Sequence, residues 1–351
     1  MRTFTSFCCF AIFTCIAVFG YAQEKQPLKL VETIPLPGVK GRLDHMDTDL
    51  DGTRLFVAAV ENGTLEVANL ETKKVISSLP GFAGTQAVWF LGGEFNKLYV
   101  TSLDGMLTIF HADTLRVYDT IKLGPGPNRL LFDPATKLMY VTFGGMDAGF
   151  DRYGRVGIVD ARTTTLIADI IAPSLRPGHL AEMVFEDGGQ KLLACDSRAN
   201  MLYQFDTIKR QLIKSWPARG DGGGDMGIDP VNHRLFVGTR TPPEMTVYDS
   251  ESGKEIASLP TPEEMDGVYY DAKVKRIYVS GGRWFGQALA PEGWVYVYQQ
   301  KDADHYELMS KVKTRPGSGT SLFVPKLNRL YVASQATDAQ EAAVLVYEPQ
   351  P

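Results

Sequence analysis

The sequence predicts an all-β fold, a seven-bladed β-propeller of four-stranded antiparallel blades. Three observations predict it. A short strand motif recurs seven times, its copies are 41 to 53 residues apart, and the last repeat lacks a strand that the N-terminal region offers. Alternating apolar residues of β-branched and aromatic type favour strands, and no stretch has sustained helical periodicity. We expect one closed domain over residues 23–351, after a signal peptide over residues 1–22.

The first 22 residues are typical of a secretory signal peptide. Arg2 supplies a positive charge, residues 7–19 are almost wholly apolar, and Gly20 and Ala22 occupy the two positions where signal peptidase requires small residues. The apolar run is too short to span a bilayer, and no later stretch approaches that length. We expect cleavage after Ala22 and a periplasmic or secreted protein. A retained N-terminal anchor is the alternative.

Removal of this segment changes the cysteine count. Three of the four cysteines leave with it, so the mature chain keeps Cys195 alone and forms no internal disulfide. We expect Cys195 to be a small buried residue and not a nucleophile, since it stands in a strand-like segment.

Each repeat is expected to contain four strands in a fixed order. A short apolar strand ends near an Asp-containing turn. The recurring motif follows as the second strand, with a basic or aliphatic residue, then an aliphatic residue, usually an aromatic residue, and usually valine. The motif copies are residues 54–57, 97–100, 138–141, 191–194, 234–237, 276–279 and 329–332. The third strands are residues 65–70, 107–113, 156–161, 202–207, 245–250, 295–300 and 344–349. Fourth strands close six repeats, at residues 74–80, 116–123, 165–172, 211–217, 254–260 and 307–313.

The two ends of the mature chain complement each other. The seventh repeat stops after its third strand, whereas residues 28–38 read as a strand without a blade of its own and resemble the fourth strand of the second repeat. We therefore expect the N-terminal strand to complete the last blade. Closure of the ring removes an open sheet edge that would otherwise promote aggregation.

Composition limits the classes of partner. The formal net charge is -5 and no basic run occurs. This charge distribution argues against nucleic acid or an anionic membrane as the main partner, because phosphate binding needs clustered Lys and Arg. The 34 glycines and 20 prolines are scattered along the chain, as the turns of a many-stranded fold require.

One repeat carries a family resemblance. The segment NKLYVTSLDGMLTIFHADTLRVYDTIKLG, which begins at Asn96, resembles the repeat of the YncE-like, or YVTN-repeat, bacterial β-propeller family. Residues 99–102 match its Tyr-Val-Thr-Asn core, with Ser102 in place of the final asparagine. The likeness extends over essentially the whole mature chain. It implies an exported propeller, and it implies no general catalytic motif.

The innermost strand of each blade lines the central channel of a propeller, so the start of that strand marks the channel mouth. Nine positions before each motif copy stand His45, Val88, Arg129, Glu182, Asp225, Gly267 and Thr320. A slip in the second blade would put Gln86 there in place of Val88. Close by in the sequence stand Arg42, Asn128, His179 and Asp266. Several blades therefore offer an ionisable group to one place.

These residue types are compatible with two kinds of site. Glu182, Asp225 and Asp266 are candidate oxygen ligands of a divalent cation such as calcium, with Asn128 as a neutral ligand. His45 is a candidate base or transition-metal ligand. Arg42 and Arg129 are candidate contacts for an anionic group of a ligand. The alternative is that these charges pair with one another and hydrate a water-filled channel.

Two insertions explain the two longest spacings. Residues 142–155 and 280–294 extend the link between the second and third strands of the third and sixth blades. Both should therefore lie on the face that carries the channel mouth, where long loops are often functional. Tyr153, Arg283 and Trp284 are candidate binding residues on this rim. The alternative is that the aromatic residues pack the insertions onto the propeller. The glycine-rich residues 220–227 lack a phosphate-loop ending, and we expect a flexible entry to the fifth blade.

The leading functional hypothesis is an exported, non-catalytic binding or scaffold protein. A small-molecule ligand or a protein partner would bind on the loop-bearing face at the channel. The alternative is a metal-dependent hydrolase of the lactonase type that uses the channel-mouth carboxylates. A partner subunit of a redox system is a third hypothesis, although the chain has no haem-attachment cysteine pair.

Overall fold

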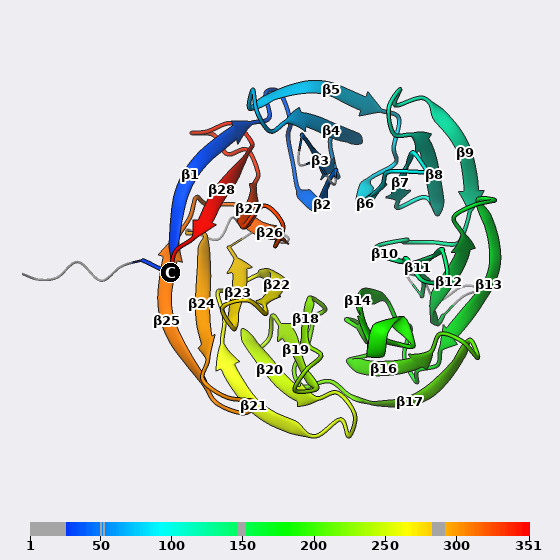
Figure 1. The fold of residues 1–351 in the computed structure, drawn as a ribbon, viewed down its shortest axis with the longest axis vertical. Coiled ribbons are helices and arrows are strands. Elements are labelled where there is room, and N and C mark those ends of the chain that lie inside the picture. The colour runs from blue at the N-terminus through cyan, green and yellow to red at the C-terminus, as the bar shows by residue number, and fades with distance from the viewer. Residues whose placement is uncertain (1–25, 50, 52, 146–151, 283–291) are drawn as a thin grey trace, which may run out of the picture.

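The protein is a closed ring of seven four-stranded antiparallel sheets, with the innermost strands toward the centre of the ring (Figure 1). The structure is a computed structural model and describes residues 26–49, 51, 53–145, 152–282 and 292–351. The predicted signal peptide lies outside the described residues. Among the described residues the one helical element is a 3-10 turn, η1 (Asp187–Gly189). The described part of the chain has no helix that is long and apolar enough to cross a membrane.

The blades follow one another along the chain, each from its innermost strand outward. The first three are β2 (Leu43–Thr48), β3 (Arg54–Ala59), β4 (Thr64–Asn69), β5 (Lys74–Pro80); β6 (Thr85–Leu91), β7 (Lys97–Ser102), β8 (Met106–His111), β9 (Val117–Lys122); and β10 (Leu130–Asp133), β11 (Leu138–Gly144), β12 (Gly154–Asp160), β13 (Thr165–Ala172). The next three are β14 (Leu180–Glu186), β15 (Lys191–Asp196), β16 (Met201–Asp206), β17 (Gln211–Pro217); β18 (Met226–Asp229), β19 (Arg234–Thr239), β20 (Glu244–Asp249), β21 (Glu255–Pro260); and β22 (Met265–Asp271), β23 (Arg276–Gly281), β24 (Trp294–Gln300), β25 (Tyr306–Lys313). The seventh blade is β26 (Ser318–Val324), β27 (Arg329–Ser334), β28 (Ala343–Pro349) and β1 (Leu28–Pro35).

The N-terminal strand completes the seventh blade, as predicted. β1 pairs with β28 in antiparallel register, from Leu28 opposite Pro349 to Pro35 opposite Ala343, with one irregularity. Ile34 of this strand is fully buried. The seventh sheet therefore contains two ends of the chain that are more than 300 residues apart.

The recurring motif is explained by packing between blades. Each neighbouring pair of blades encloses one hydrophobic cluster, and all seven clusters are built alike. The third motif residue of one blade packs against the second and fourth motif residues of the next blade, as Phe56 does against Leu98 and Val100. Both faces of every second strand are thus buried, which accounts for its unbroken apolar pattern.

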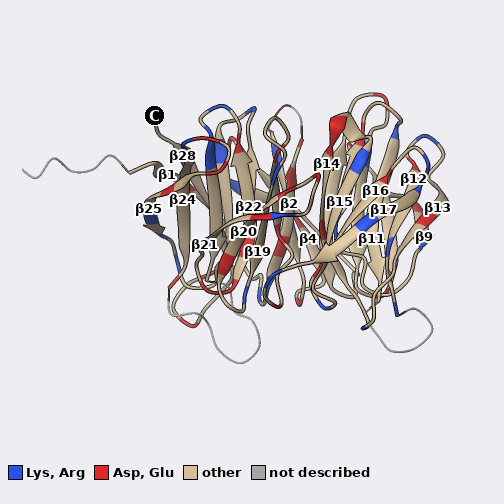
Figure 2. Ribbon diagram, turned by 90° about the horizontal axis from the view of Figure 1, so that it is seen from below, with Lys and Arg blue, Asp and Glu red and all other residues tan. Residues whose placement is uncertain are grey.

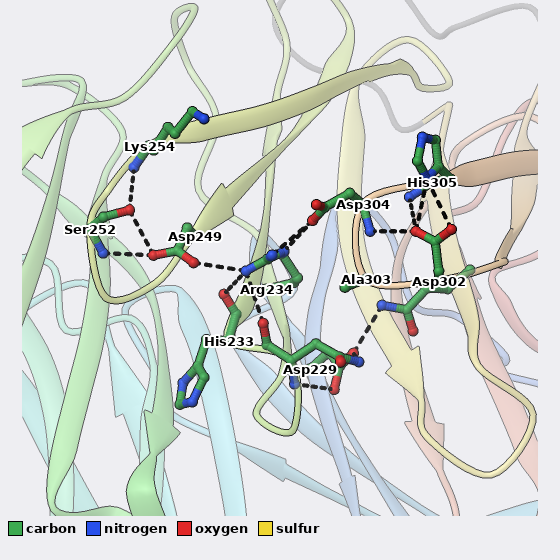
Figure 3. Close-up of polar contacts among 12 residues, drawn as sticks. Asp229, His233, Arg234, Asp249, Ser252, Lys254, Asp302, Ala303, Asp304 and His305 are labelled. Carbon is green, nitrogen blue, oxygen red and sulfur yellow. Dashed lines mark hydrogen bonds and ion pairs between the residues drawn. The ribbon is translucent and has the colours of Figure 1, made fainter.

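The basic residue that opens most motif copies connects each blade to the next one. Arg54 Nη1 donates to the carbonyl of Ala112 at 2.7 Å, and Lys97 Nζ donates to that of Ala161 at 2.6 Å. Figure 3 shows the connection between the fifth and sixth blades, where Arg234 lies between Asp249 and Asp304. The remaining contacts of this kind are Lys191 with Glu251 and Arg276 with the carbonyl of Gln350. Five junctions therefore carry a forward-reaching cation at the same position, and we call these contacts the forward straps.

The strands run between two loop-bearing faces (Figure 2). We call the face where the chain enters the innermost strands the entry face, and the opposite one the exit face. Both insertions begin and end on the entry face. Gly178 donates to the carbonyl of Arg152 at 2.9 Å, and Gly317 donates to that of Gly282 at 3.1 Å. These hydrogen bonds hold the insertion ends against the loops that lead into the fourth and seventh blades.

Ring closure can be tested within one strand. Ile34→Ala should lower the free energy of unfolding by about 2–5 kcal/mol, because the change leaves a cavity in the cluster between the seventh and first blades. Leu30→Ala, at a position of the same strand that is 49% exposed, should change it by about 0.5 kcal/mol or less. Urea unfolding measures both. Equal, small effects would show that the N-terminal strand does not belong to the ring.

Candidate functional site

A polar cavity of about 400 Å³ lies at the channel mouth on the entry face. It is lined by Arg42, Asp44, His45, Gln86, Leu103, Asn128, His179, Ala181, Ser197, Arg198, Gly222, Gly223, Gly224, Asp225, Arg240 and Asp266. The lining carries three arginines, three aspartates and two histidines from four of the blades and the segments that enter them. Its volume lies in the usual range for small-ligand sites, and most of its lining residues have polar or charged side chains.

Five of the residues predicted from the sequence line this cavity together. They are Arg42, His45, Asn128, Asp225 and Asp266, and His179, which the sequence placed close by, is a sixth. Arg129 and Glu182 are not part of the lining. Arg129 contacts His45, which is, and Glu182 pairs with Arg129. In the second blade the nine-residue step is off by two: Gln86 borders the cavity, whereas Val88 is buried in the cluster between the first and second blades.

Irregular pairing at the start of the inner strands explains why the step slipped. Register shifts occur in β2, β6, β14, β22 and β26 close to the entry face. In the other two blades the strands β10 and β18 begin only after Arg129 and Asp225. A β-bulge redirects a side chain and ends regular pairing. Side chains at these positions therefore do not follow the two-residue alternation of the rest of the strand.

Arg129 occupies the channel and connects blades that are not neighbours. Its Nε lies 2.7 Å from Oε1 of Glu182 in the fourth blade, and its Nη1 lies 3.3 Å from Nδ1 of His45 in the first. Burial lowers the pKa of Arg129, yet Glu182 and further acidic groups raise it above the ordinary value. The guanidinium therefore stays charged and lies against His45, a residue of the cavity wall.

His45 is held as a neutral imidazole. A guanidinium only donates hydrogen bonds, so Nδ1 of His45 accepts from Arg129 and the ring proton sits on Nε2, which faces Asp44 at 3.8 Å. Burial lowers the pKa of His45, and the charge of Arg129 lowers it further. Neither ring nitrogen then offers a lone pair to a substrate, which weakens the hypothesis that His45 is a general base.

The rim of the cavity consists of paired charges. Arg240 donates to Oδ1 of Asp266 and to the carbonyl of Gly222, while Thr320 donates to the other oxygen of Asp266. Nη1 of Arg42 lies 3.3 Å from Oδ2 of Asp44. His179 adds a neutral ring, because burial and the charge of Arg198 lower its pKa to about 4.

The geometry does not gather the three predicted metal ligands. Glu182 is bound to Arg129, and Asp266 is bound to Arg240 and Thr320. Within the described residues, Glu182, Asp225 and Asp266 do not bring ligand atoms within 4.8 Å of one another. The carboxylates at the mouth thus hold arginines in place, which departs from the expected oxygen cage around a cation.

Sequence reasoning missed several lining residues, and two of them have a recognisable signal. Arg198 and Arg240 stand six or seven positions after the start of a motif copy, in the turns that follow β15 and β19. Counting six or seven positions forward from each motif copy, in addition to nine positions back, would have found both residues. Gly223 belongs to the glycine-rich segment expected to be flexible. It is tightly placed instead, since a Cβ there would lie 2.0 Å from the carbonyl oxygen of Gly238.

The predicted rim is described only in part. Arg283 and Trp284 lie outside the described residues. Tyr153 is described, and it does not line the channel-mouth cavity. It borders a second, more apolar cavity of about 660 Å³ at the edge of the entry face, together with Pro173, Leu175, Met201 and Pro217. Cys195 is buried as expected, and burial raises the pKa of its thiol.

Comparison with known proteins adds the fold and nothing more specific. No family model matches the chain, and no curated protein matches it. Many solved structures do. One is a chain from the "Crystal Structure of Mitotic Checkpoint Complex", with a TM-score of 0.73 and 12% sequence identity over 98% of this chain and 98% of that one. At that identity the likeness establishes the propeller fold alone.

Asp47 stands on β2, two residues after His45, and its protonation is unusual for an aspartate. Its Oδ2 accepts from the backbone N–H of Phe90 at 2.6 Å, and its Oδ1 accepts from that of Thr48 at 2.8 Å. The residue is partly exposed. Burial nevertheless raises its pKa to about 7, against the opposing effect of these hydrogen bonds and of Arg129.

This shift has a defined sign in stability. The folded carboxyl keeps its proton up to about pH 7, whereas the unfolded one releases it near pH 4, so the wild type loses stability as the pH rises through that window. Asp47→Asn removes the titration. The free energy of unfolding of Asp47→Asn relative to the wild type should therefore rise by about 2 kcal/mol between pH 5 and pH 8 in urea unfolding.

The exposed Asp338→Asn serves as the matched control and should show no such pH dependence. A difference between Asp47→Asn and the wild type that stays constant from pH 5 to pH 8 would contradict the raised pKa.

Proposed function

We propose that this protein is a non-catalytic binding propeller that takes a small polar ligand in the cavity at the channel mouth. The observation that carries the proposal is the alternation of charge around the rim, with Arg42, Arg198 and Arg240 set among Asp44, Asp225 and Asp266. A ligand that fits has an anionic group for the arginines and hydrogen-bond donors for the carboxylates. The compact volume selects against large ligands.

The arrangement supports binding over catalysis. Nδ1 of His45 accepts from Arg129, Nε2 carries the ring proton, and burial favours this neutral state. Arg129 is fixed by Glu182 and contacts His45 of the cavity wall, so this wall residue is already held in place before a ligand arrives. Preorganised charge lowers the cost of binding, because few side chains lose freedom.

The resemblance to the YncE-like family and the N-terminal leader extend this proposal. A periplasmic or secreted location suits a propeller that has a single buried cysteine among its mature residues. In such a setting the protein would act as a binding or scaffold protein for a small molecule or for a polar segment of a partner protein.

Export is tested by the mature N-terminus. The full chain expressed in a bacterium should be recovered without residues 1–22, and intact mass should place its first residue at Gln23. Ala22→Arg should block the cleavage, since signal peptidase requires a small residue there. Recovery of the wild type with residues 1–22 still attached would contradict a cleaved leader.

Ligand binding is tested with a panel of amino acids, hydroxy acids and short peptides in a thermal-shift screen. At least one compound that carries both an acid and a donor group should raise the melting temperature. Arg240→Gln should weaken its binding about tenfold or more in calorimetry, because a charge-assisted contact is lost. The control is Arg219→Gln, an arginine of the same blade that pairs with Glu244 and Glu255 away from the cavity.

Two results would contradict the proposal. One is a panel in which no compound shifts the melting temperature. The other is equal affinity in Arg240→Gln, in Arg42→Gln and in the control.

A further inference from the structure

A second polar cluster lies on the exit face, at the junction of the fourth and fifth blades. Glu186 ends β14, Asp187 begins η1, and His233 stands in the turn between β18 and β19. Each of the three offers a ligand atom, and these atoms lie within 4.8 Å of one another. Among the described residues no other group of three His, Cys, Asp or Glu side chains meets this distance.

Glu186 departs from the pattern of the repeat. The position five residues before the motif is Asp49 in the first blade, Asp133 in the third and Asp229 in the fifth. Each of these carboxylates accepts from a backbone N–H of its own turn. The longer Glu186 reaches into the fifth blade instead, where its Oε1 lies 2.9 Å from Nδ1 of His233.

One oxygen of this carboxylate has no partner. Oε1 of Glu186 accepts from Ser250 and meets His233, whereas Oε2 is buried and makes no hydrogen bond. The residue is 2% exposed, so bulk water does not reach that oxygen. Buried acceptors of this kind are rare in folded proteins, and a bound cation is one of the partners that satisfies them.

The distances suit a metal ion. Ligands bound at about 2.1 Å to one ion lie roughly 3 to 4 Å apart, and Nδ1 of His233 and Oε1 of Glu186 are 2.9 Å apart. Lys191 lies 2.6 Å from Oδ2 of Asp187 and 3.2 Å from Oε1 of Glu251. Lys191 supplies one positive charge against the three carboxylates of Glu186, Asp187 and Glu251, so negative charge is in excess. The side chain of His233 is 38% exposed, so an ion has access from solvent.

The protonation of His233 points to the same excess of negative charge. The hydrogen bond to Glu186 raises its pKa, and the charges of Glu186, Glu251 and Asp187 add to that effect. An imidazole nitrogen beside carboxylate oxygens is a donor set that first-row divalent ions prefer over calcium or magnesium.

We propose that Glu186, Asp187 and His233 bind one divalent first-row transition ion, with Zn²⁺ as its representative, and that water fills the remaining positions. The ion would bridge the fourth and fifth blades on the exit face. This site is independent of the cavity on the entry face, and its test does not depend on the ligand proposed there.

The probe is Zn²⁺ itself, added to untagged full-length protein in competition with a chromophoric chelator. The wild type should bind one equivalent and gain melting temperature. His233→Asn should weaken binding about tenfold or more. Asparagine is the matched replacement, because Asn96 and Asn328 occupy the same turn position with similar positive φ angles of 46° and 51°. His305→Asn is the control, since His305 pairs with Asp302 on the surface without a third ligand.

Asp187→Asn provides a second variant at an accessible position, should His233→Asn fail to fold. Tenfold weaker Zn²⁺ binding in either variant supports the site, provided that His305→Asn binds Zn²⁺ as tightly as the wild type does. The proposal is overturned if the wild type takes up no stoichiometric Zn²⁺, or if a folded His233→Asn or Asp187→Asn variant keeps its affinity.

Discussion

The pairing of β1 with β28 is the contact on which the rest of the ring depends. A blade buries both faces of its second strand only when it has a neighbour on each side, and the first and seventh blades become neighbours only if the circle closes. β1 supplies the outer strand of the seventh blade and brings Ile34 into the cluster that these two blades share. With that seam in place, seven equivalent interfaces replace six interfaces and two exposed sheet faces. The interface between the seventh and first blades therefore stabilises the whole ring, because it leaves no blade without a neighbour.

Most of the fold was predictable because each blade packs against the next in the same way, and this packing requires the same residue types in every repeat. Phe56, Leu98 and Val100 show how one aromatic and two aliphatic positions meet across a junction, and the same rule recurs seven times. A period of this kind survives substitution, since any large apolar side chain at those positions fills the space. The candidate site was predicted less completely. Bulges shift the register where the inner strands begin, so Gln86 and not Val88 reaches the cavity.

The chemistry of the channel mouth was the least predictable part, for an electrostatic reason. The sequence places Glu182 and Asp266 near the mouth, but it does not reveal that Arg129 and Arg240 lie within reach of them. Arg129 comes from the third blade and meets groups of the first and fourth, which no local spacing encodes. Three-dimensional pairing thus changes a set of apparent cation ligands into a neutralised rim. Two cations and two carboxylates that seemed independent in the sequence act as fixed pairs in the fold.

The forward straps affect how freely the blades can diverge in evolution. In three of the five, a basic side chain ends on a backbone carbonyl, at Ala112, Ala161 and Gln350. Every residue has a carbonyl, so the receiving turn can change its side chain without losing the contact. Lys191 and Arg234 instead meet the carboxylates of Glu251 and Asp304, and those two junctions tie a cation to one particular partner. The straps from the fourth to the fifth blade and from the fifth to the sixth therefore depend on the side chain that receives them, while the straps that end on a carbonyl do not.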